Sequence, residues 1–287
     1  MNIKISGASG YLGNLITAEL TTKGHKVDGL KRELLYGPTE KLADALKGSN
    51  VVVHLAGSPL LVRWTDKNKQ TIIDSRVVTA QNIVRAIKSL PSQDRPEKVV
   101  SASGVSIYAS GKFHTEDSSD YDHTFLSDVV REWEKSWEAL PQTVSLTIFR
   151  MAVVLGKESP TIKTMLLPFK LGVGGKIGKG HQPFPFVHER DVVNAYTWAI
   201  ENQLTGGIYN LAAPHQVSNE SFTNSFAKAL GRPAFMYVPP IALKLAYGEA
   251  AEMLTEGPSV YPDKLIKKGF KFQYPSIENA MNEIFHA

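Results

Sequence analysis

The sequence IKISGASGYLG, residues 3–13, places an apolar extended segment directly before three glycines spaced by three, and a helical pattern of apolar residues follows it. This order predicts a strand, a tight turn and a helix. We expect Gly7 to permit the turn, Gly10 to let a pyrophosphate approach bare backbone, and Gly13 to allow close packing of helix and strand. Because a helix N-terminus presents free N–H groups and partial positive charge, the stretch predicts a dinucleotide site rather than a purely structural turn.

The composition narrows the class of protein. The chain has 287 residues, of which 43% are hydrophobic, with 22 glycines, 16 prolines and no cysteine. Without cysteine there are no disulfides, no thiolate metal ligands and no cysteine nucleophile. The net charge of +4 (32 basic minus 28 acidic residues) is too small to indicate a nucleic-acid partner. No run approaches the length of a membrane span and no signal-peptide pattern precedes the first strand, so we expect a cytoplasmic protein without a membrane partner.

The order of apolar runs along the chain predicts the fold. Further strands are expected at residues 25–30, 51–57, 98–103 and 144–150, with helical patterns between them. This alternation indicates an α/β fold, a Rossmann-type doubly wound parallel sheet with a small C-terminal α/β substrate lobe. We expect residues 1–287 to form a single unit, with a dinucleotide-binding core of about 1–155 plus 187–212. The substrate-side lobe would then take about 156–186 and 213–287.

The end of the second expected strand bears on cofactor choice. Dinucleotide folds that select NAD place an acid there for the ribose 2′-hydroxyl, whereas those that select NADP place an arginine there. This chain has Lys31 and Arg32, and Asp28 lies too early, inside the strand. Because a guanidinium binds phosphate bidentately, the pair favours NADP over NAD. The alternative is a solvated basic turn.

Small or polar residues follow two other strands. Ala56 and Gly57 end one strand and would let a cofactor lie across the sheet. Arg76, in the helical stretch from about 64 to 89, reaches a phosphate in one interpretation and is a helix-surface cation in the other. Ser103 ends the strand at 98–103, at the edge where such sheets bind ligands, and its hydroxyl suits a substrate oxygen. Its alternative role is to cap a turn.

A glycine-rich, basic segment at residues 170–180 admits two interpretations. Backbone N–H groups and lysines there would fit the phosphates of a nucleotide-type substrate, or the segment is a run of turns with solvated lysines. His181 and His188 lack a third ligand at a recognisable spacing, so no metal site is predicted.

Taken together, these motifs resemble a known superfamily. The glycine turn and the strands ending in Gly57 and Ser103 are similar to extended short-chain dehydrogenase/reductases, which include nucleotide-sugar epimerases and dehydratases. Later motifs are similar to an atypical branch, the NAD-dependent epimerase/dehydratase-like proteins of the "cell division inhibitor-related" type. These motifs lie at residues 103–108, 115–117, 133–134, 150–156, 167–172, 187–191, 210–214 and 231–233.

The resemblance implies hydride chemistry, yet the chain departs from the superfamily pattern. The superfamily uses a Ser-Tyr-Lys set, with Tyr and Lys four residues apart on the helix after the Ser strand. Here that helix, residues 125–135, holds no tyrosine. The sequence Tyr108 to Lys112 has the right spacing but lies in a turn, where we interpret it as a chance match. Ser103 and Tyr108 are nevertheless the catalytic candidates, with Tyr108 entering from the loop.

The predicted cofactor contacts include Val154, which the resemblance places beside the nicotinamide. The full set is Gly7, Ser9, Gly10, Tyr11, Leu12, Gly13, Lys31, Arg32, Leu55, Ala56, Gly57, Arg76 and Val154. Two functions stay open. One is an NADP-dependent oxidoreductase or epimerase acting on a small polar substrate such as a nucleotide sugar; the other is a non-catalytic NADP-binding sensor or scaffold. Because extended members often dimerise, a homodimer is a further expectation.

Overall fold

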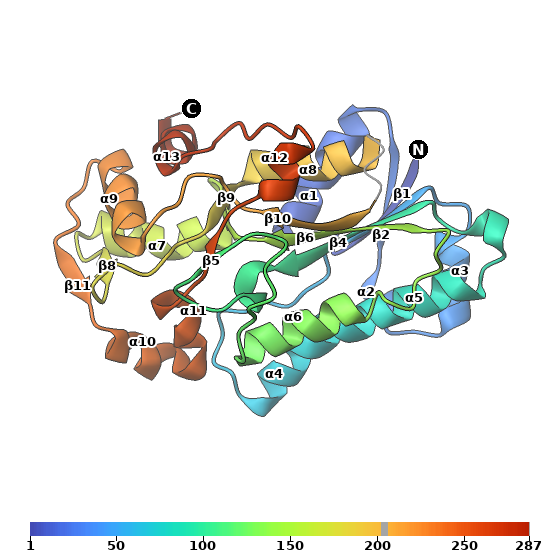
Figure 1. Ribbon diagram of the computed structural model, residues 1–287, viewed down its shortest axis with the longest axis horizontal. Coiled ribbons are helices and arrows are strands. Elements are labelled where there is room, and N and C mark those ends of the chain that lie inside the picture. Colours follow the sequence, from blue (N-terminus) through green and yellow to red (C-terminus); the bar gives the residue numbers. More distant parts are fainter. Residues whose placement is uncertain (202–205, 287) are drawn as a thin grey trace.

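A six-stranded parallel sheet forms the centre of the computed structural model, which describes residues 1–201 and 206–286 (Figure 1). Its spatial order is β10-β6-β4-β3-β1-β2, so β1 is an inner strand with β2 on one side and β3 on the other. The chain therefore winds outward from β1 in both directions, as a doubly wound sheet requires. The strands are β1 (Asn2–Ser6), β2 (Lys26–Leu30), β3 (Val51–His54), β4 (Lys98–Gly104), β6 (Ser145–Met151) and β10 (Gly207–Leu211).

Helices cover both faces of this sheet, which explains the continuous apolar runs in its strands. Val51 and Val53 of β3 belong to one core with α1 and α8, whereas Val52 belongs to the core with α3, α5 and α6. Figure 1 shows α5 and α6 below the sheet and α1 and α8 above it. The helices are α1 (Tyr11–Thr22), α3 (Thr39–Leu46), α5 (Thr79–Ser89), α6 (Phe125–Lys135) and α8 (Glu189–Glu201).

The predicted long helix at 64–89 is interrupted in the structure. α4 (Asp66–Ile73) and α5 are joined by a π-helical turn, Asp74–Val78, which carries Arg76. A π turn adds a residue to the helical repeat and changes the direction in which the following side chains point. The interruption therefore aims Arg76 at the end of β3 instead of at solvent.

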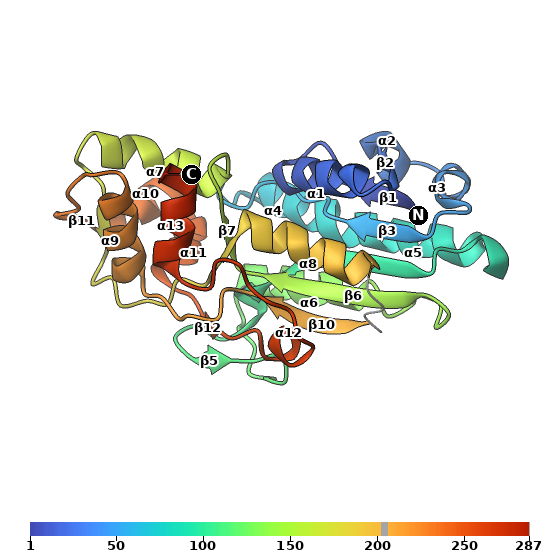
Figure 2. The same ribbon diagram turned by 90° about the horizontal axis from the view of Figure 1, so that it is seen from above.

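The remaining elements gather beyond the carboxyl ends of the strands, at the left in Figure 2. The strand pair β7 with β9 and the helices α7, α9 and α13 share a core that includes Phe169, Phe222 and Phe226. A second pair, β8 with β11, contacts α9 through β8. The bounds are β7 (Val153–Leu155), β8 (Gly175–Ile177), β9 (Phe186–His188), β11 (Met236–Val238), α7 (Pro160–Lys170), α9 (Asn219–Ala229), α10 (Pro240–Tyr247), α11 (Glu252–Thr255) and α13 (Ile277–His286).

Four smaller elements lie outside these groups. α2 (Arg32–Leu35) follows β2 directly, β5 (Phe113–His114) pairs with β12 (Ser259–Val260), and α12 (Asp263–Lys267) packs on β10. The side-chain amide of Asn210 in β10 donates to the carbonyl of Tyr261, which follows β12. In the described ranges, no helix has both the length and the apolarity needed to cross a bilayer.

Candidate functional site

The glycine turn after β1 has the geometry expected of a phosphate-binding turn. Gly7 has φ +77°, and the N–H of Gly10 donates to the carbonyl of Gly7 at 3.0 Å. A Cβ on Gly13 would lie 2.1 Å from that carbonyl, whereas a Cβ on Gly10 would meet only the same oxygen at 3.2 Å. Gly13 is therefore needed for packing, and Gly10 faces otherwise open space.

The N-terminus of α1 is left open by the protein itself. Gly10 is the N-cap, no side chain caps the helix, and the first turn holds no acid. The first N–H groups of a helix have no partner within it, and together they attract an anion. Ser9 beside them is exposed, while Leu12 packs against the sheet core. Tyr11 donates a hydrogen bond to Glu189 at the start of α8.

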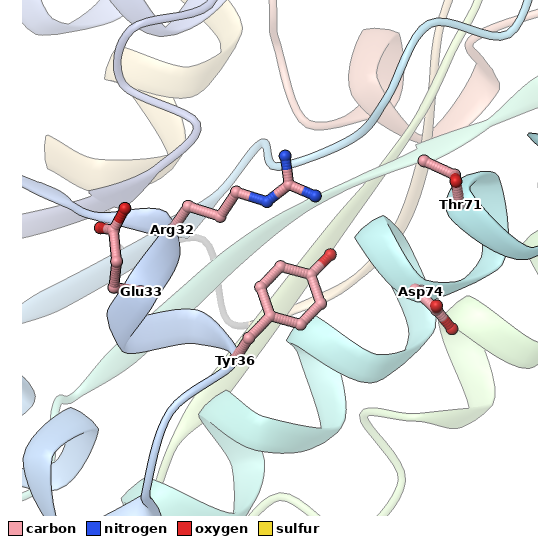
Figure 3. A pocket seen from close by; sticks show the side chains of 5 residues that line it. All are labelled: Arg32, Glu33, Tyr36, Thr71 and Asp74. Atoms are coloured by element: carbon pink, nitrogen blue, oxygen red, sulfur yellow. The ribbon is translucent and has the colours of Figure 1, made fainter.

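A cavity of about 340 Å³ opens beyond β2, between α2 and the junction of α4 with the π turn (Figure 3). Its lining consists of Arg32, Glu33, Tyr36, Thr71 and Asp74. The Arg32 guanidinium lies 5.5 Å from the centre of the Tyr36 ring, and no carboxylate within the described chain pairs with Arg32. Figure 3 shows Arg32 and Tyr36 reaching toward Thr71 and Asp74, with Glu33 pointing away.

The carboxylate nearest to this cavity on β2, that of Asp28, is already paired with a lysine. Asp28, in the middle of β2, accepts a hydrogen bond from Lys4 at 2.7 Å, and this bond is the main reason that the pKa of Asp28 is lowered. Lys31, the N-cap of α2, is exposed beside Arg32. Lys31 and Arg32 are therefore the cations available directly after β2, while the exposed Glu33 beside them points away from the cavity centre (Figure 3).

Arg76 is buried at the end of β3, a position that the sequence alone did not predict. Its side chain is almost fully buried, and its guanidinium donates to the carbonyls of Ile72 and Ser58 at 3.3 and 3.0 Å and lies over the Trp133 ring. No acid of the described residues pairs with it, and burial lowers its pKa to about 10. The guanidinium fills the space that a Cβ on Gly57 would need, 3.0 Å from Nη2. The structure therefore rejects the helix-surface interpretation.

The strand end beneath Arg76 is tightly packed. A Cβ on Gly7 would come within 2.9 Å of the backbone of Leu55 and Ala56, so the glycine turn and the end of β3 touch. His54 is fully buried, with Nδ1 2.6 Å from the Ser6 hydroxyl. Burial, aided by the charge of Arg76, lowers the pKa of His54 to about 3.

The two catalytic candidates are both held by internal partners. Ser103 donates to Glu134 Oε1 at 2.6 Å, and Glu134 forms a two-point ion pair with Arg150 at 2.8 and 2.7 Å. Tyr108 is 1% exposed; its hydroxyl donates to Asn210 and accepts from Arg150, both at 2.8 Å. Burial raises the pKa of Tyr108. Tyr108 does not reach an open surface from its loop, so this arrangement does not support the predicted role of either hydroxyl.

A different hydroxyl stands free at the end of β4, one that the sequence interpretation missed. Ser106, in the 3-10 turn Val105–Ile107, is half-buried and has no hydrogen-bond partner in the described part of the protein. A Cβ on Gly104 would lie 3.4 Å from Ser106 Oγ and 3.5 Å from a methyl group of Val130 on α6. The end of β4 therefore faces an aliphatic side chain of α6 beside the Ser106 hydroxyl.

Other predicted groups have structural partners. Val154 lies in β7, paired with Val187 of β9. His188 is buried with Nε2 2.9 Å from Glu283. Asp191 lies within α8 and accepts from the backbone N–H groups of Gln273 and Tyr274 at 2.7 and 3.0 Å. Over the described ranges no group of three His, Asp or Glu residues is arranged to hold a metal ion.

Comparison of the whole chain with known proteins places it in a family. Residues 3–212 match the model of the NAD dependent epimerase/dehydratase family. The chain belongs to this family. Residues 238–284 match a second model, a domain of unknown function named DUF1731.

Full-length relatives of this family member are found in animals and bacteria. The epimerase family protein SDR39U1 of Bos taurus is 33% identical over 296 residues, covering 99% of both chains. YfhF of Bacillus subtilis is 32% identical over 299 residues, covering 99% of this chain and 98% of the relative. The crystal structure of human SDR39U1 with NADPH has a TM-score of 0.92 at 33% identity, covering 99% of each chain.

Proposed function

We propose that this family member binds NADP(H) along the carboxyl edge of its sheet and uses it to oxidise, reduce or epimerise a small polar substrate. A nucleotide sugar is the first substrate class to test. The observation that carries the proposal is the free guanidinium of Arg32 in the cavity beyond β2, on the same edge as the uncapped N-terminus of α1. That human SDR39U1 was crystallised with NADPH supports the same choice of cofactor.

Each part of the proposed site would bind one part of the cofactor. The N–H groups after Gly10 would bind the pyrophosphate, and Arg32 with Lys31 would bind the 2′-phosphate. Tyr36 offers an aromatic face to the adenine in the same cavity. Arg76 would supply a positive charge that no acid of the described chain neutralises. Bound nicotinamide would supply a hydride donor or acceptor.

At the reacting end, Ser106 is our candidate for positioning a substrate oxygen. Its hydroxyl is free, whereas Ser103 and Tyr108 are held by Glu134, Arg150 and Asn210. The segments beyond the strand ends, about 156–186 and 213–287, would cover the substrate. The Ser106→Ala variant should lower turnover with little change in NADPH affinity if this assignment holds.

Calorimetric titration with NADPH and NADH tests the cofactor. Wild-type protein should prefer NADPH, and Arg32→Ala should weaken NADPH binding about tenfold, with little effect on NADH, because one charge-assisted phosphate contact is lost. Arg85→Ala, which removes an exposed arginine from α5, is the matched control. Equal loss for both cofactors, or none, would remove the 2′-phosphate role from Arg32.

A second function has its own support. Because α6 carries no tyrosine and both predicted catalytic hydroxyls are occupied, the chain also suits a non-catalytic NADP sensor. A turnover screen with NADPH, carbonyl compounds and nucleotide sugars separates the two. Tight cofactor binding without turnover on any of them would favour the sensor.

A further inference from the structure

Charge is distributed unevenly along the chain. Residues 159–180 and 221–248 contain seven lysines and arginines and not one aspartate or glutamate. The rest of the protein then carries 25 basic and 28 acidic residues, a net charge of −3 against +7 for these 50 residues. Among the residues that the structure describes, only Lys163 and Lys176 of the seven pair with a carboxylate. Their partners are Glu158 and Glu220, which flank the two segments.

The same two segments expose most of the large apolar side chains that the protein leaves uncovered. Eight of the twelve in the described residues lie at 167–173 and 235–245. Phe235 is 92% exposed, Leu245 71% and Leu171 68%. α10, with the sequence PIALKLAY, has no buried residue at all. A helix this apolar normally buries one face, so its exposure indicates a partner outside the chain.

The elements that carry these side chains are continuous in space. After α7, the chain turns back on the helix end, where the Val173 N–H donates a hydrogen bond to the Pro168 carbonyl at 3.0 Å. β8 then pairs with β11 in parallel, and Gly178 N–H donates to the Val238 carbonyl at 3.0 Å, immediately before α10. Figure 2 shows α7, α10 and β11 together at the end of the molecule away from β1 and β2. The exposed apolar groups and the unpaired cations thus occur in one region.

We propose that this region, formed by α7, β8, β11 and α10, docks on a bilayer surface that contains anionic lipids. Apolar side chains enter the boundary between head groups and acyl chains, and the cations bind lipid phosphates. Six of the seven cations are lysines, whose long stems let the charge reach outward while the methylenes stay in the apolar layer. Protein interfaces are instead enriched in arginine and depleted in lysine, so a lipid surface fits better than an acidic protein.

This contact is peripheral and does not depend on the proposed cofactor. It departs from the sequence-based expectation of no membrane partner, which rested on the lack of a spanning segment. Cosedimentation with vesicles tests it. Wild-type protein should pellet with phosphatidylcholine vesicles containing 30% phosphatidylglycerol, a proportion we choose for the assay, and much less with phosphatidylcholine alone. The difference should shrink in about 0.5 M salt, where charges are screened over a few ångströms.

Two variants should weaken the contact. Replacing Lys170, Lys179, Arg232 and Lys244 with Gln should lower the apparent partition coefficient about tenfold or more. Ile241→Gln with Leu245→Gln should lower it even at low salt, because apolar insertion is lost. The matched control replaces exposed lysines elsewhere, namely Lys67, Lys88, Lys268 and Lys271, with Gln and should bind as wild type.

Three results would overturn the proposal. They are no pelleting with anionic vesicles at low salt, equal loss in the control variant, and a dimer that forms through α10 in place of vesicle binding. The last would appear in analytical ultracentrifugation as concentration-dependent association that the Ile241→Gln, Leu245→Gln variant abolishes. NADPH titration of each variant confirms folding and keeps this test separate from the cofactor proposal.

Discussion

The polar side chains at the carboxyl ends of β1 and β2 have different partners from those at the carboxyl ends of β4 and β6. Each group is called an edge of the sheet below. Near β1 and β2, the α1 N-terminus has no side-chain cap, and Arg32 has no acidic partner in the described ranges. Near β4 and β6, Ser103, Glu134 and Arg150 satisfy one another. We propose that the first edge binds an external anion, whereas the polar groups at the second edge bind one another. A dinucleotide-binding framework can therefore persist while the residues of the usual proton relay are absent or used elsewhere.

The largest predicted effect tests whether the β4–β6 edge is structural. Glu134→Gln removes the carboxylate from Arg150, which is 97% buried, and leaves a buried guanidinium without its counter-charge. We expect the free energy of unfolding in urea to fall by about 3 kcal/mol. Glu132→Gln, which alters an exposed pair on the same helix, should cost less than about 1 kcal/mol. A stable Glu134→Gln protein that loses only activity would instead make Glu134 part of the reaction.

The next effect separates packing from binding within the glycine turn. Gly13→Ala places a Cβ 2.1 Å from the Gly7 carbonyl and should destabilise the fold by about 2–3 kcal/mol. Gly10→Ala meets a single oxygen at 3.2 Å, so it should cost less than about 1 kcal/mol while weakening NADPH binding about tenfold. Thermal unfolding and NADPH titration measure the two quantities. If both variants lost stability equally, the open side of Gly10 would have no special role.

The smallest predicted effect is the pH dependence of stability that the buried His54 of β3 causes. The pKa of His54 is about 3 in the folded protein, below the value near 6.5 of an unfolded chain, so unfolding takes up a proton at intermediate pH. Stability is therefore lost as pH falls from about 6.5 toward 3, by about 2 kcal/mol at pH 5. His54→Gln should flatten the difference in unfolding free energy between pH 7 and pH 5.

The exposed His123→Gln is the control for the removal of an imidazole. Parallel pH curves for wild type and His54→Gln would mean that His54 does not link protonation to unfolding. His188, whose pKa burial also lowers, contributes in the same direction and remains in both proteins. The measured difference between them therefore belongs to His54.

Local patterns predicted the backbone well where they were complete. The strand, tight turn and helix predicted from residue 3 onward are confirmed as β1, the Gly7 turn and α1, because an apolar strand and a glycine turn adjoin in sequence. The break at Asp74–Val78 could not be predicted, since a π turn leaves the apolar pattern almost unchanged. α13 was missed although its amphipathic sequence offered a signal.

Side-chain roles were harder to predict because their partners lie far along the chain. Ser103 meets Glu134, 31 residues later, and Tyr108 meets Asn210, 102 residues later. A strand-end position says that a hydroxyl is near the ligand edge, but not whether another side chain already binds it. The proposed cofactor contacts, by contrast, depend on backbone and on local charge, which short motifs carry; they stay a prediction that the binding experiments test.

The contact between Gly57 and Arg76 has an evolutionary consequence. Since a Cβ at position 57 would lie 3.0 Å from Arg76 Nη2, any larger residue there would force the guanidinium to shift, so we expect the two positions to vary together. Relatives that carry alanine or a bulkier side chain at 57 should have a short residue at 76, and would then have to supply the missing charge from another helix. Paired substitution at these two sites would mark the lineages in which this end of the sheet has been rebuilt.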